Sequence, residues 1–166
     1  LRFVDRVDKD MGLDLVWLEP VFTQKKGVGT THKIVDFESA KRNHELFYPM
    51  CAKYGIPNQA YPHCTRELKL QPFRSWKREN MRNAYSAIGI RADEIDRVPA
   101  NSGIDRLVYP LISWHETTKQ DVNDFWASYK YNLNLPEHKG NCVTCWKKTD
   151  RKLFTLANED EKLFHH

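Results

Sequence analysis

Short apolar segments alternate with segments of helical periodicity along nearly the whole chain. The apolar segments, which have the length of strands, cover residues 13–18, 32–37, 85–91 and 107–112. The helical segments cover residues 1–11, 38–54 and 65–82, a stretch that begins near residue 118, and a last one after residue 142. Because this alternation is typical of a mostly parallel sheet with helices on both faces, we predict a three-layer α/β fold.

Local signals place several helix ends. Gly12 is expected to end the first helix, and Gly55 the second, because glycine readily adopts the left-handed backbone at a helix C-terminus. Thr118 and Asp121 have the spacing of a capping box, which begins a helix. Pro72 predicts an interruption or a kink in the third helix, because proline lacks a backbone N–H.

The length of 166 residues suits one domain with a hydrophobic core. We expect residues 1–132 to form an α/β nucleotide-binding-like core. This core is expected to be N-terminally incomplete, because the first residues already resemble the middle of a helix. Residues 133–166 are expected to form a C-terminal segment with a CxxC motif and a helix, packed on the same domain. Trp114 and Trp126 are assigned to core packing.

The composition points to a soluble globular protein. Hydrophobic residues make up 40% of the chain and charged residues 29%, and no apolar run approaches the ~20 residues that cross a membrane. We therefore expect a cytoplasmic protein with no membrane partner. The formal net charge of +4 is compatible with anionic ligands, but it does not separate a nucleotide from a nucleic acid.

Four cysteines carry the strongest chemical signal: Cys51, Cys64, Cys142 and Cys145. The last two form a CxxC motif, whose spacing lets two thiolates reach one metal ion from a turn. With Cys64 and Cys51 the set has enough sulfur for a tetrahedral zinc site or an iron–sulfur cluster. A redox-active CxxC and plainly structural cysteines are the alternatives. His63 is a weaker ligand candidate than Cys51, since adjacent residues in an extended segment face opposite sides.

Cationic side chains occur at two places where anions commonly bind. Arg66 and Lys69 lie in the first turns of a predicted helix, whose unpaired N–H groups attract anions. Arg91 follows a predicted strand, with Asp93 and Glu94 behind it, at the sheet edge where α/β proteins bind ligands. We predict that these five residues contribute to an adenine-nucleotide site. The alternative is that they are ordinary solvated charges.

Four segments resemble the phosphoadenosine-phosphosulfate reductases, a family of the PP-loop type. Residues 88–94 are similar to the Gly-x-Arg-x-x-Glu segment that these enzymes share with sulfate adenylyltransferase small subunits. Residues 64–69 resemble the Cys-x-x-x-x-Lys segment, and residues 109–122 the Pro-Leu…Trp…Asp-Val signature. Residues 140–145 look like the late Gly-x-Cys-x-x-Cys of cluster-binding members. These segments span most of the chain in the family's order, and compact bacteriophage members look most similar.

The resemblance implies a Rossmann-like, adenine nucleotide α-hydrolase-type fold that binds ATP or phosphoadenosine phosphosulfate and acts on sulfur. Cys64, Cys142 and Cys145 match ligands of the family's four-iron cluster, whereas His63 flanks Cys64 where the family has a second cysteine. The implied cofactor is a [4Fe-4S] cluster, or zinc in its place. Either Cys51 or His63 would be the fourth ligand, or the site has only three protein ligands.

Two features of the family are missing from these 166 residues. The Ser-Gly-Gly-type phosphate loop, with the first strand, would lie upstream of Leu1, and no cysteine follows Cys145 to act as the reductases' nucleophile. The resemblance therefore favours adenylation-driven sulfur insertion, as in DNA-phosphorothioation and tRNA-thiolation enzymes. It implies an enzyme or an enzyme subunit with a nucleic-acid sulfur acceptor and a protein partner, in a bacterial or phage-infected cell.

Two other functions fit the same sequence. The first is a zinc-stapled, basic nucleic-acid-binding module, in which cations of one segment track phosphates: Arg66, Lys69, Arg74, Lys77 and Arg78. The second is a catalytically inactive phage structural or interaction protein that kept the fold. A fold by itself does not choose between such functions, because function lies in the site.

Overall fold

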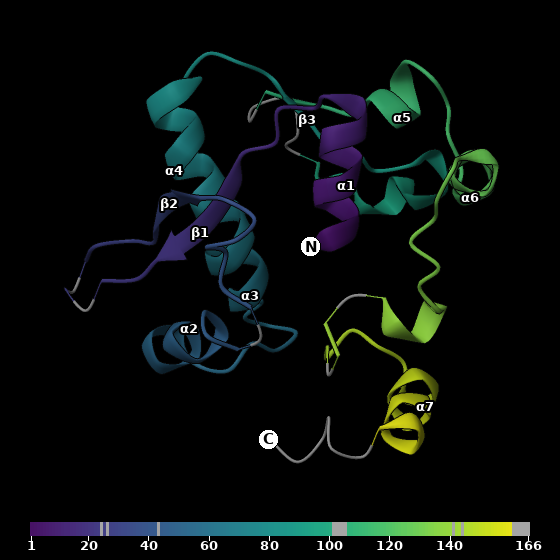
Figure 1. The fold of residues 1–166 in the computed structure, drawn as a ribbon. Helices are drawn as coiled ribbons and strands as arrows, with labels where there is room; N and C mark the ends of the chain where they lie inside the picture. Colours follow the sequence, from purple (N-terminus) through teal and green to yellow (C-terminus); the bar gives the residue numbers. More distant parts are fainter. Residues whose placement is uncertain are drawn as a thin grey trace. The chain divides into compact units, whose positions relative to one another are not determined.

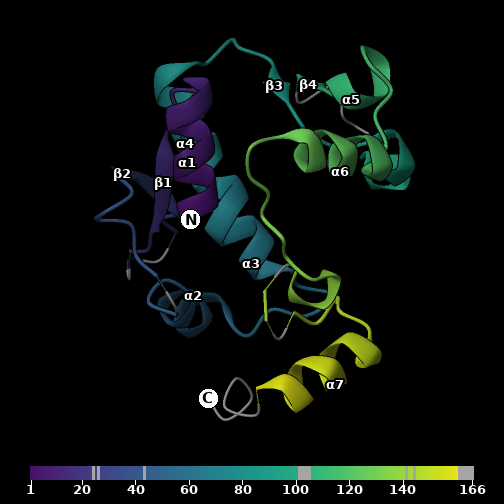
Figure 2. The ribbon, with the colours of Figure 1, turned by 45° about the vertical axis from the view of Figure 1, so that its right-hand side comes forward.

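The computed structural model describes residues 1–23, 25, 27–42, 44–100, 106–140, 142–143 and 145–160. It divides the chain into two compact units. The first unit combines Leu1–Asn80 with Asn134–His166, and the second is Met81–Leu133. In Figures 1 and 2 the first unit contains the purple and blue segments and the yellow C-terminal helix, while the second contains the green helices.

Helix α1 (Arg2–Met11) opens the first unit and ends where glycine was expected to end it. Gly12 has a left-handed backbone, with φ of 61°, and its N–H donates to the carbonyl oxygen of Asp8 at 2.8 Å. Glycine adopts this conformation without the steric cost that a Cβ atom would impose. The predicted first helix and its C-terminus are confirmed.

Strands β1 (Trp17–Val21) and β2 (Thr31–Val35) form an antiparallel hairpin in which Glu19 pairs with Lys33. The first strand begins later than residue 13, the predicted start, because Asp14 has a positive φ of 53° that interrupts an extended backbone. Pro20 is tolerated within β1 because a two-stranded sheet consists only of edges.

Helix α2 (Phe47–Tyr54) is shorter than the predicted helix over residues 38–54. Asp36 and Ser39 form a turn instead, in which the Asp36 carboxylate accepts the Ser39 N–H at 2.7 Å. Such local side-chain bonds compete with helix formation. Gly55 ends α2 as expected, and its N–H donates to the Cys51 carbonyl oxygen at 2.8 Å.

A second helical run contains α3 (His63–Thr65), the π-helical turn η1 (Arg66–Leu70) and α4 (Gln71–Asn80). The Gln71 N–H donates to the Arg66 carbonyl, five residues earlier, so one turn is wider than an α-helical turn. This wider turn directly precedes Pro72, whose ring would otherwise clash with the carbonyl four residues before it. The interruption predicted near Pro72 is therefore a π turn, and α4 packs against both strands of the hairpin (Figure 1).

The C-terminal part of the first unit contains the 3₁₀ turn η3 (Glu137–Lys139) and α7 (Asp150–Glu159). Glu159 pairs with Lys139 and with His138, each at 2.9 Å, and Lys152 pairs with Glu137 at 2.8 Å. These ion pairs connect the two elements in addition to their direct packing.

The second unit contains β3 (Ser86–Ala87), the 3₁₀ segment η2 (Ala92–Arg97), β4 (Leu107–Val108), α5 (Pro110–Ser113) and α6 (Lys119–Ser128). The two short strands are parallel, and Ser86 pairs with Leu107. The predicted capping box is confirmed, because the Thr118 side chain accepts the Asp121 N–H while the Asp121 carboxylate accepts the Thr118 N–H.

The predicted three-layer, mostly parallel Rossmann-like sheet is wrong for this structure. The described residues form two sheets of two strands each, one antiparallel and one parallel, within a predominantly helical chain. Residues 22–30, which join β1 to β2, form a hairpin connection, whereas a parallel crossover usually needs a dozen or more residues and a helix. Some of the predicted strands therefore exist, but the predicted parallel pairing of the first two strands is wrong.

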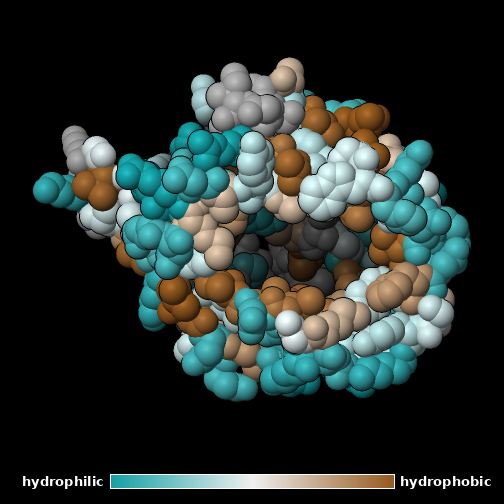
Figure 3. All heavy atoms as spheres, turned by 90° about the horizontal axis from the view of Figure 1, so that it is seen from above, coloured by the Kyte–Doolittle hydropathy of each residue, from teal (hydrophilic) through white to brown (hydrophobic). Residues whose placement is uncertain are grey.

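Few apolar side chains are fully enclosed. Among the described residues the buried hydrophobic ones are Ala40, Met50 and Leu156. Trp114, which was assigned to the core, is 74% exposed, whereas Trp126 contacts the rings of neighbouring aromatic residues in the second unit. On the face seen in Figure 3, hydrophobic residues are interspersed with hydrophilic ones. No helix within the described ranges combines the length and the apolar character that a bilayer crossing requires.

Candidate functional site

Helix α2, which carries Cys51, contacts α3, which carries Cys64. Burial raises the pKa of the Cys51 thiol, and the nearby charge of Cys64 raises it further. Both residues are partly buried free thiols rather than halves of a disulfide. The structure therefore brings together two of the four predicted metal ligands, although 12 residues of sequence separate them.

The CxxC motif forms a turn. The Cys145 N–H donates to the Cys142 carbonyl oxygen at 3.3 Å, and the Lys148 N–H donates to the Cys145 carbonyl oxygen at 2.8 Å. The buried ammonium group of Lys148 also donates to the carbonyl oxygens of His138 and Gly140, at 2.5 and 2.7 Å. Lys148 thus anchors the backbone on both sides of Cys142. Asn141 and Thr144 of the motif lie outside the described residues.

All four cysteines belong to the first unit and all are free thiols, which is the donor chemistry that zinc and iron–sulfur clusters require. Within the described part of the chain, no three His, Cys, Asp or Glu side chains are grouped so that they could hold one metal ion. Cys142 and Cys145 share one backbone turn, and the charge of Cys64 acts on Cys51. The metal site and its fourth ligand stay predictions.

His63, the other candidate for the fourth ligand, is engaged by three neighbours. Its ring stacks on Tyr54 and on Tyr61, with centroid distances of 6.1 and 5.9 Å. Its Nδ1 lies 3.3 Å from the Arg66 guanidinium. Metal ligation through Nδ1 would require this hydrogen bond to break, whereas ligation through Nε2 would not.

A buried carboxylate lies under the π turn. Glu67 is 3% exposed, and its carboxylate accepts hydrogen bonds from the Thr30 hydroxyl and from Nε of Arg66, the latter at 2.5 Å. The Thr30 hydroxyl also lies 3.0 Å from the Tyr54 hydroxyl. A buried charge is tolerated only where it has such partners. Glu67 thereby connects the segment before β2, α2 and the π turn. Figure 2 shows that α2 and α3 are neighbours.

Arg66 and Lys69, both predicted to bind an anion, project from this turn. Arg66 keeps about half of its side chain exposed, at 49%, while its guanidinium lies 5.8 Å from the centre of the Tyr54 ring. Contacts with Glu67, His63 and Tyr54 therefore orient Arg66 without enclosing it. Lys69 is exposed.

Arg91, Asp93 and Glu94 belong to the second unit and contact one another. Arg91 forms two hydrogen bonds with the Asp93 carboxylate, at 2.9 and 3.3 Å, and pairs with Glu94 at 3.2 Å. The hydrogen bond from Arg91 holds the pKa of Asp93 below its usual value, and the same bond raises the pKa of Arg91. Because Arg66 and Lys69 belong to the first unit, a joint nucleotide site stays a prediction.

Sequence reasoning missed Glu67, Thr30 and Tyr54. Glu67 stands between two cations in the sequence, and neither Thr30 nor Tyr54 belongs to a recognisable motif. The only local signal was Pro72, which predicted an irregular turn nearby. The burial of Glu67 depends on residues 37 and 13 positions away, so no local pattern reveals it.

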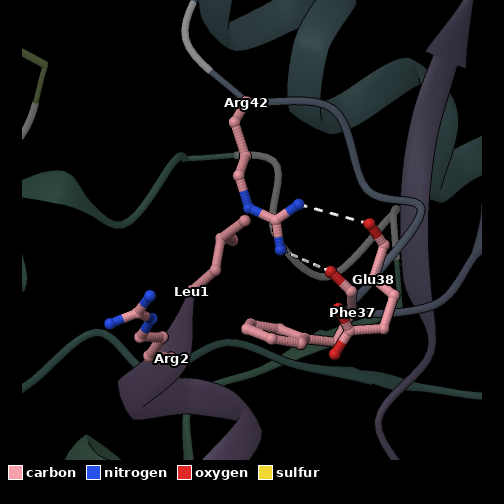
Figure 4. Close-up of a pocket in the computed structure, with 5 residues that line it drawn as sticks. All are labelled: Leu1, Arg2, Phe37, Glu38 and Arg42. Atoms are coloured by element: carbon pink, nitrogen blue, oxygen red, sulfur yellow. Dashed lines mark hydrogen bonds between the residues drawn. The ribbon is translucent and has the colours of Figure 1, made fainter.

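A separate cavity of about 450 Å³ lies beside the first residues of α1. It is lined by Leu1, Arg2, Phe37, Glu38 and Arg42 (Figure 4). The Arg42 guanidinium donates to the backbone carbonyl oxygens of Phe37 and Glu38, at 2.6 and 3.3 Å, and lies over the Phe37 ring. Arg42 therefore closes a loop, and none of the predicted site residues lines this cavity.

The chain matches no protein-family model, and no solved structure is similar to it. It is 32% identical over 168 residues to ORF290, an uncharacterized nin region protein of Escherichia phage lambda. The alignment covers 98% of this chain and 56% of the phage protein, so the chain spans little more than half the length of that relative. This similarity agrees with the likeness to bacteriophage proteins found in the sequence.

Proposed function

We propose that this chain carries a cysteine-ligated metal site, a [4Fe-4S] cluster or zinc, within a protein that transfers sulfur with the help of an adenine nucleotide. The observation that carries the proposal is the set of four free cysteines in one unit, paired as Cys51 with Cys64 and as Cys142 with Cys145. Soft metals prefer thiolate ligands, and two pairs supply the four that either site needs.

Each pair contributes differently to the proposed site. Cys142 and Cys145 would ligate from a turn whose backbone Lys148 anchors on both sides of Cys142, so this backbone is largely pre-organised. Cys51 and Cys64 would ligate from α2 and α3, next to the buried Glu67. A cluster or zinc ion held by all four thiolates would leave zinc no open coordination position, so its role in the proposal is to fix the fold of the first unit. With all four thiols used as ligands, the transferred sulfur comes from a separate donor.

The nucleotide part of the proposal assigns a phosphate contact to Arg91 of the second unit, and Arg66 and Lys69 are candidate phosphate contacts of the first unit by themselves. Asp93 and Glu94 orient Arg91, and one of these carboxylates is also suited to a ribose hydroxyl. The planar guanidinium groups offer paired N–H donors, which match phosphate oxygens. Both carboxylates also neutralise Arg91 in the absence of ligand, so a nucleotide must compete with them.

The metal proposal is tested by iron and zinc analysis of protein purified without oxygen. We expect either about four irons or about one zinc per chain, and Cys64→Ser should lose most of the metal. Thr65→Ala is the matched control, because it changes the neighbouring residue without removing sulfur. Metal-free wild-type protein, even after reconstitution, would overturn the proposal. A Cys51→Ser variant with full metal content would remove Cys51 from the ligand set.

The nucleotide proposal is tested by titration calorimetry with ATP and with phosphoadenosine phosphosulfate. Arg91→Ala should weaken binding by about 1.5–3 kcal/mol, the usual contribution of a charged hydrogen bond. Arg97→Ala is the control, because Arg97 also pairs with Glu94 but is mostly exposed, at 61%. Equal affinities of the Arg91 variant and the wild type would reject the role of Arg91.

A further inference from the structure

Three aromatic rings form a continuous stack on the first unit. His63 lies in the middle, 6.1 Å from Tyr54 and 5.9 Å from Tyr61 between ring centroids, and the Tyr61 and His63 planes differ by only 12°. Tyr61, at one end, is 62% exposed. The stack thus ends in a ring that offers much of its surface to solvent and is nearly parallel to the ring behind it.

The loop before α3 holds Tyr61 in place. The Asn58 side-chain oxygen accepts the N–H groups of Ala60 and Tyr61, both at 3.0 Å. The Tyr61 carbonyl oxygen accepts the N–H groups of Asn58 and His63, at 3.1 and 2.8 Å. Pro62 follows directly and restricts the backbone further. An exposed aromatic ring on a pre-organised loop loses little conformational entropy when it binds a partner.

Cations surround the other end of the stack. The Arg66 guanidinium lies 5.8 Å from the Tyr54 ring centre and the Lys53 ammonium 5.1 Å from it. Arg66 also contacts His63, which is the ring that stacks directly on Tyr61. Aromatic rings beside cations are the combination with which proteins bind single-stranded nucleic acids, through base stacking and phosphate contacts.

We infer that Tyr61 and His63, with Arg66, form a platform on which an unpaired base of a single-stranded nucleic acid stacks while Arg66 contacts an adjacent phosphate. An exposed ring suits a strand that passes over a surface, whereas small-molecule sites usually enclose most of the ligand. A duplex should bind more weakly than a single strand, because its bases are already stacked on one another.

This inference deepens the proposed function by assigning a binding surface to a single-stranded sulfur acceptor, and it rests on that function only for the transfer of sulfur. Strand binding and metal content are separate measurements. Protein that binds metal but no strand would refute the platform alone, and protein that binds a strand but no metal would refute the metal site alone.

The test is a fluorescence-anisotropy titration of a labelled oligothymidylate of about 12 nucleotides, which is within the usual site size. We expect Tyr61→Ala and Tyr61→Leu to weaken binding about tenfold, and Tyr61→Phe to retain it, because stacking needs the ring and not the hydroxyl. Tyr48→Ala is the matched control, since Tyr48 is 57% exposed in the same unit but stands outside this stack.

Further measurements distinguish the alternative ligands from one another. Arg66→Ala should weaken binding and reduce its salt dependence by about one phosphate contact. Equal binding by Tyr61→Leu and wild type, equal binding of duplex and single strand, or no binding by the wild type would each overturn the inference. Binding of ATP that depends on Tyr61, with no strand binding, would assign the platform to a mononucleotide and overturn it too. Unchanged circular dichroism confirms that each variant is folded.

Discussion

The carboxylate of Glu67 is enclosed, although Arg66 beside it is exposed. It accepts hydrogen bonds from the Thr30 hydroxyl and from Arg66, and through Thr30 it reaches Tyr54. Removing one partner from a buried polar network leaves the others without hydrogen bonds, which costs more than the bond itself contributed. At the residue scale, Glu67 is therefore the side chain on which the order of the π turn depends most.

Glu67→Ala should lower the free energy of unfolding by about 2 kcal/mol, measured by urea denaturation. This value allows for the half-exposed guanidinium of Arg66, which water can solvate after the change. Glu67→Gln should lose less, because an amide oxygen still accepts from Thr30. Glu116→Ala, which changes an exposed carboxylate of the second unit, should stay within about 0.5 kcal/mol of the wild type. Equal effects of the two alanine variants would contradict this role.

At the scale of elements, helix ends follow rules that operate within a few residues. Gly12 and Gly55 end helices, and Thr118 begins one, because each needs only its own backbone and a neighbour three or four residues away. The π turn depends on more distant residues as well, because it involves both the position of Pro72 and the burial of Glu67. Helix α7 is held against η3 by ion pairs, and the hydrophobic periodicity of the sequence does not predict these pairs.

Thr118→Ala should lower the free energy of unfolding by about 1 kcal/mol, because the side-chain acceptor for the Asp121 N–H is lost. Thr118→Ser keeps the hydroxyl and should restore most of the stability. Chemical denaturation monitored by helical circular dichroism measures the difference. Serine and alanine variants of equal stability would show that the capping box contributes little.

Acid should loosen the contact between α7 and η3. Hydrogen bonds from Lys139 and then His138 lower the pKa of Glu159 below its ordinary value of 4.5, so the folded state binds this proton more weakly than the unfolded state. The stabilisation is complete above pH 4.5 and is lost as the pH falls through the lower folded pKa. In hydrogen exchange, amides of α7 should be better protected in the wild type than in Glu159→Gln near neutral pH. A difference that persists unchanged in acid would contradict this account.

At the scale of the whole molecule, many large apolar side chains of the described residues are exposed to solvent. Large side chains such as Trp114, Ile56 and Phe154 are 74%, 79% and 69% exposed. Contiguous apolar surface on a folded protein commonly marks a place where another chain or a ligand binds. The protein partner expected from the sequence would need such a surface, and this partner stays a prediction.

The native chain should therefore bind the apolar dye anilinonaphthalene sulfonate, with an increase in its emission. Urea should abolish this increase at the concentration that unfolds the helices, because the unfolded chain offers no organised apolar surface. Met50→Ala, which removes a completely buried side chain, should shift that transition to lower urea. Native protein that leaves the dye emission unchanged would show that the exposed apolar side chains form no binding surface.

Only part of the candidate site could be predicted from the sequence. The CxxC spacing, and the cations at positions 66, 69 and 91, could be recognised because each is a short motif. The proximity of Cys51 to Cys64 was a hypothesis based on the proline-containing return between them, and the structure supports it through the charge effect on Cys51. Whether all four sulfurs converge stays a prediction. The stack of Tyr54, His63 and Tyr61 was not foreseen, because its rings come from two elements and the loop between them.

The sequence by itself determined the features that depend on neighbouring residues: the helix ends at Gly12 and Gly55, the capping box at Thr118, and the irregular turn near Pro72. Backbone conformational preference and short-range hydrogen bonds are sufficient for these. Only the tertiary structure decided that the first two strands pair antiparallel, that Glu67 is buried and that Trp114 is exposed. Strand pairing and burial depend on which distant surfaces meet, and that outcome follows from the free energy of the whole packed unit rather than from any local pattern.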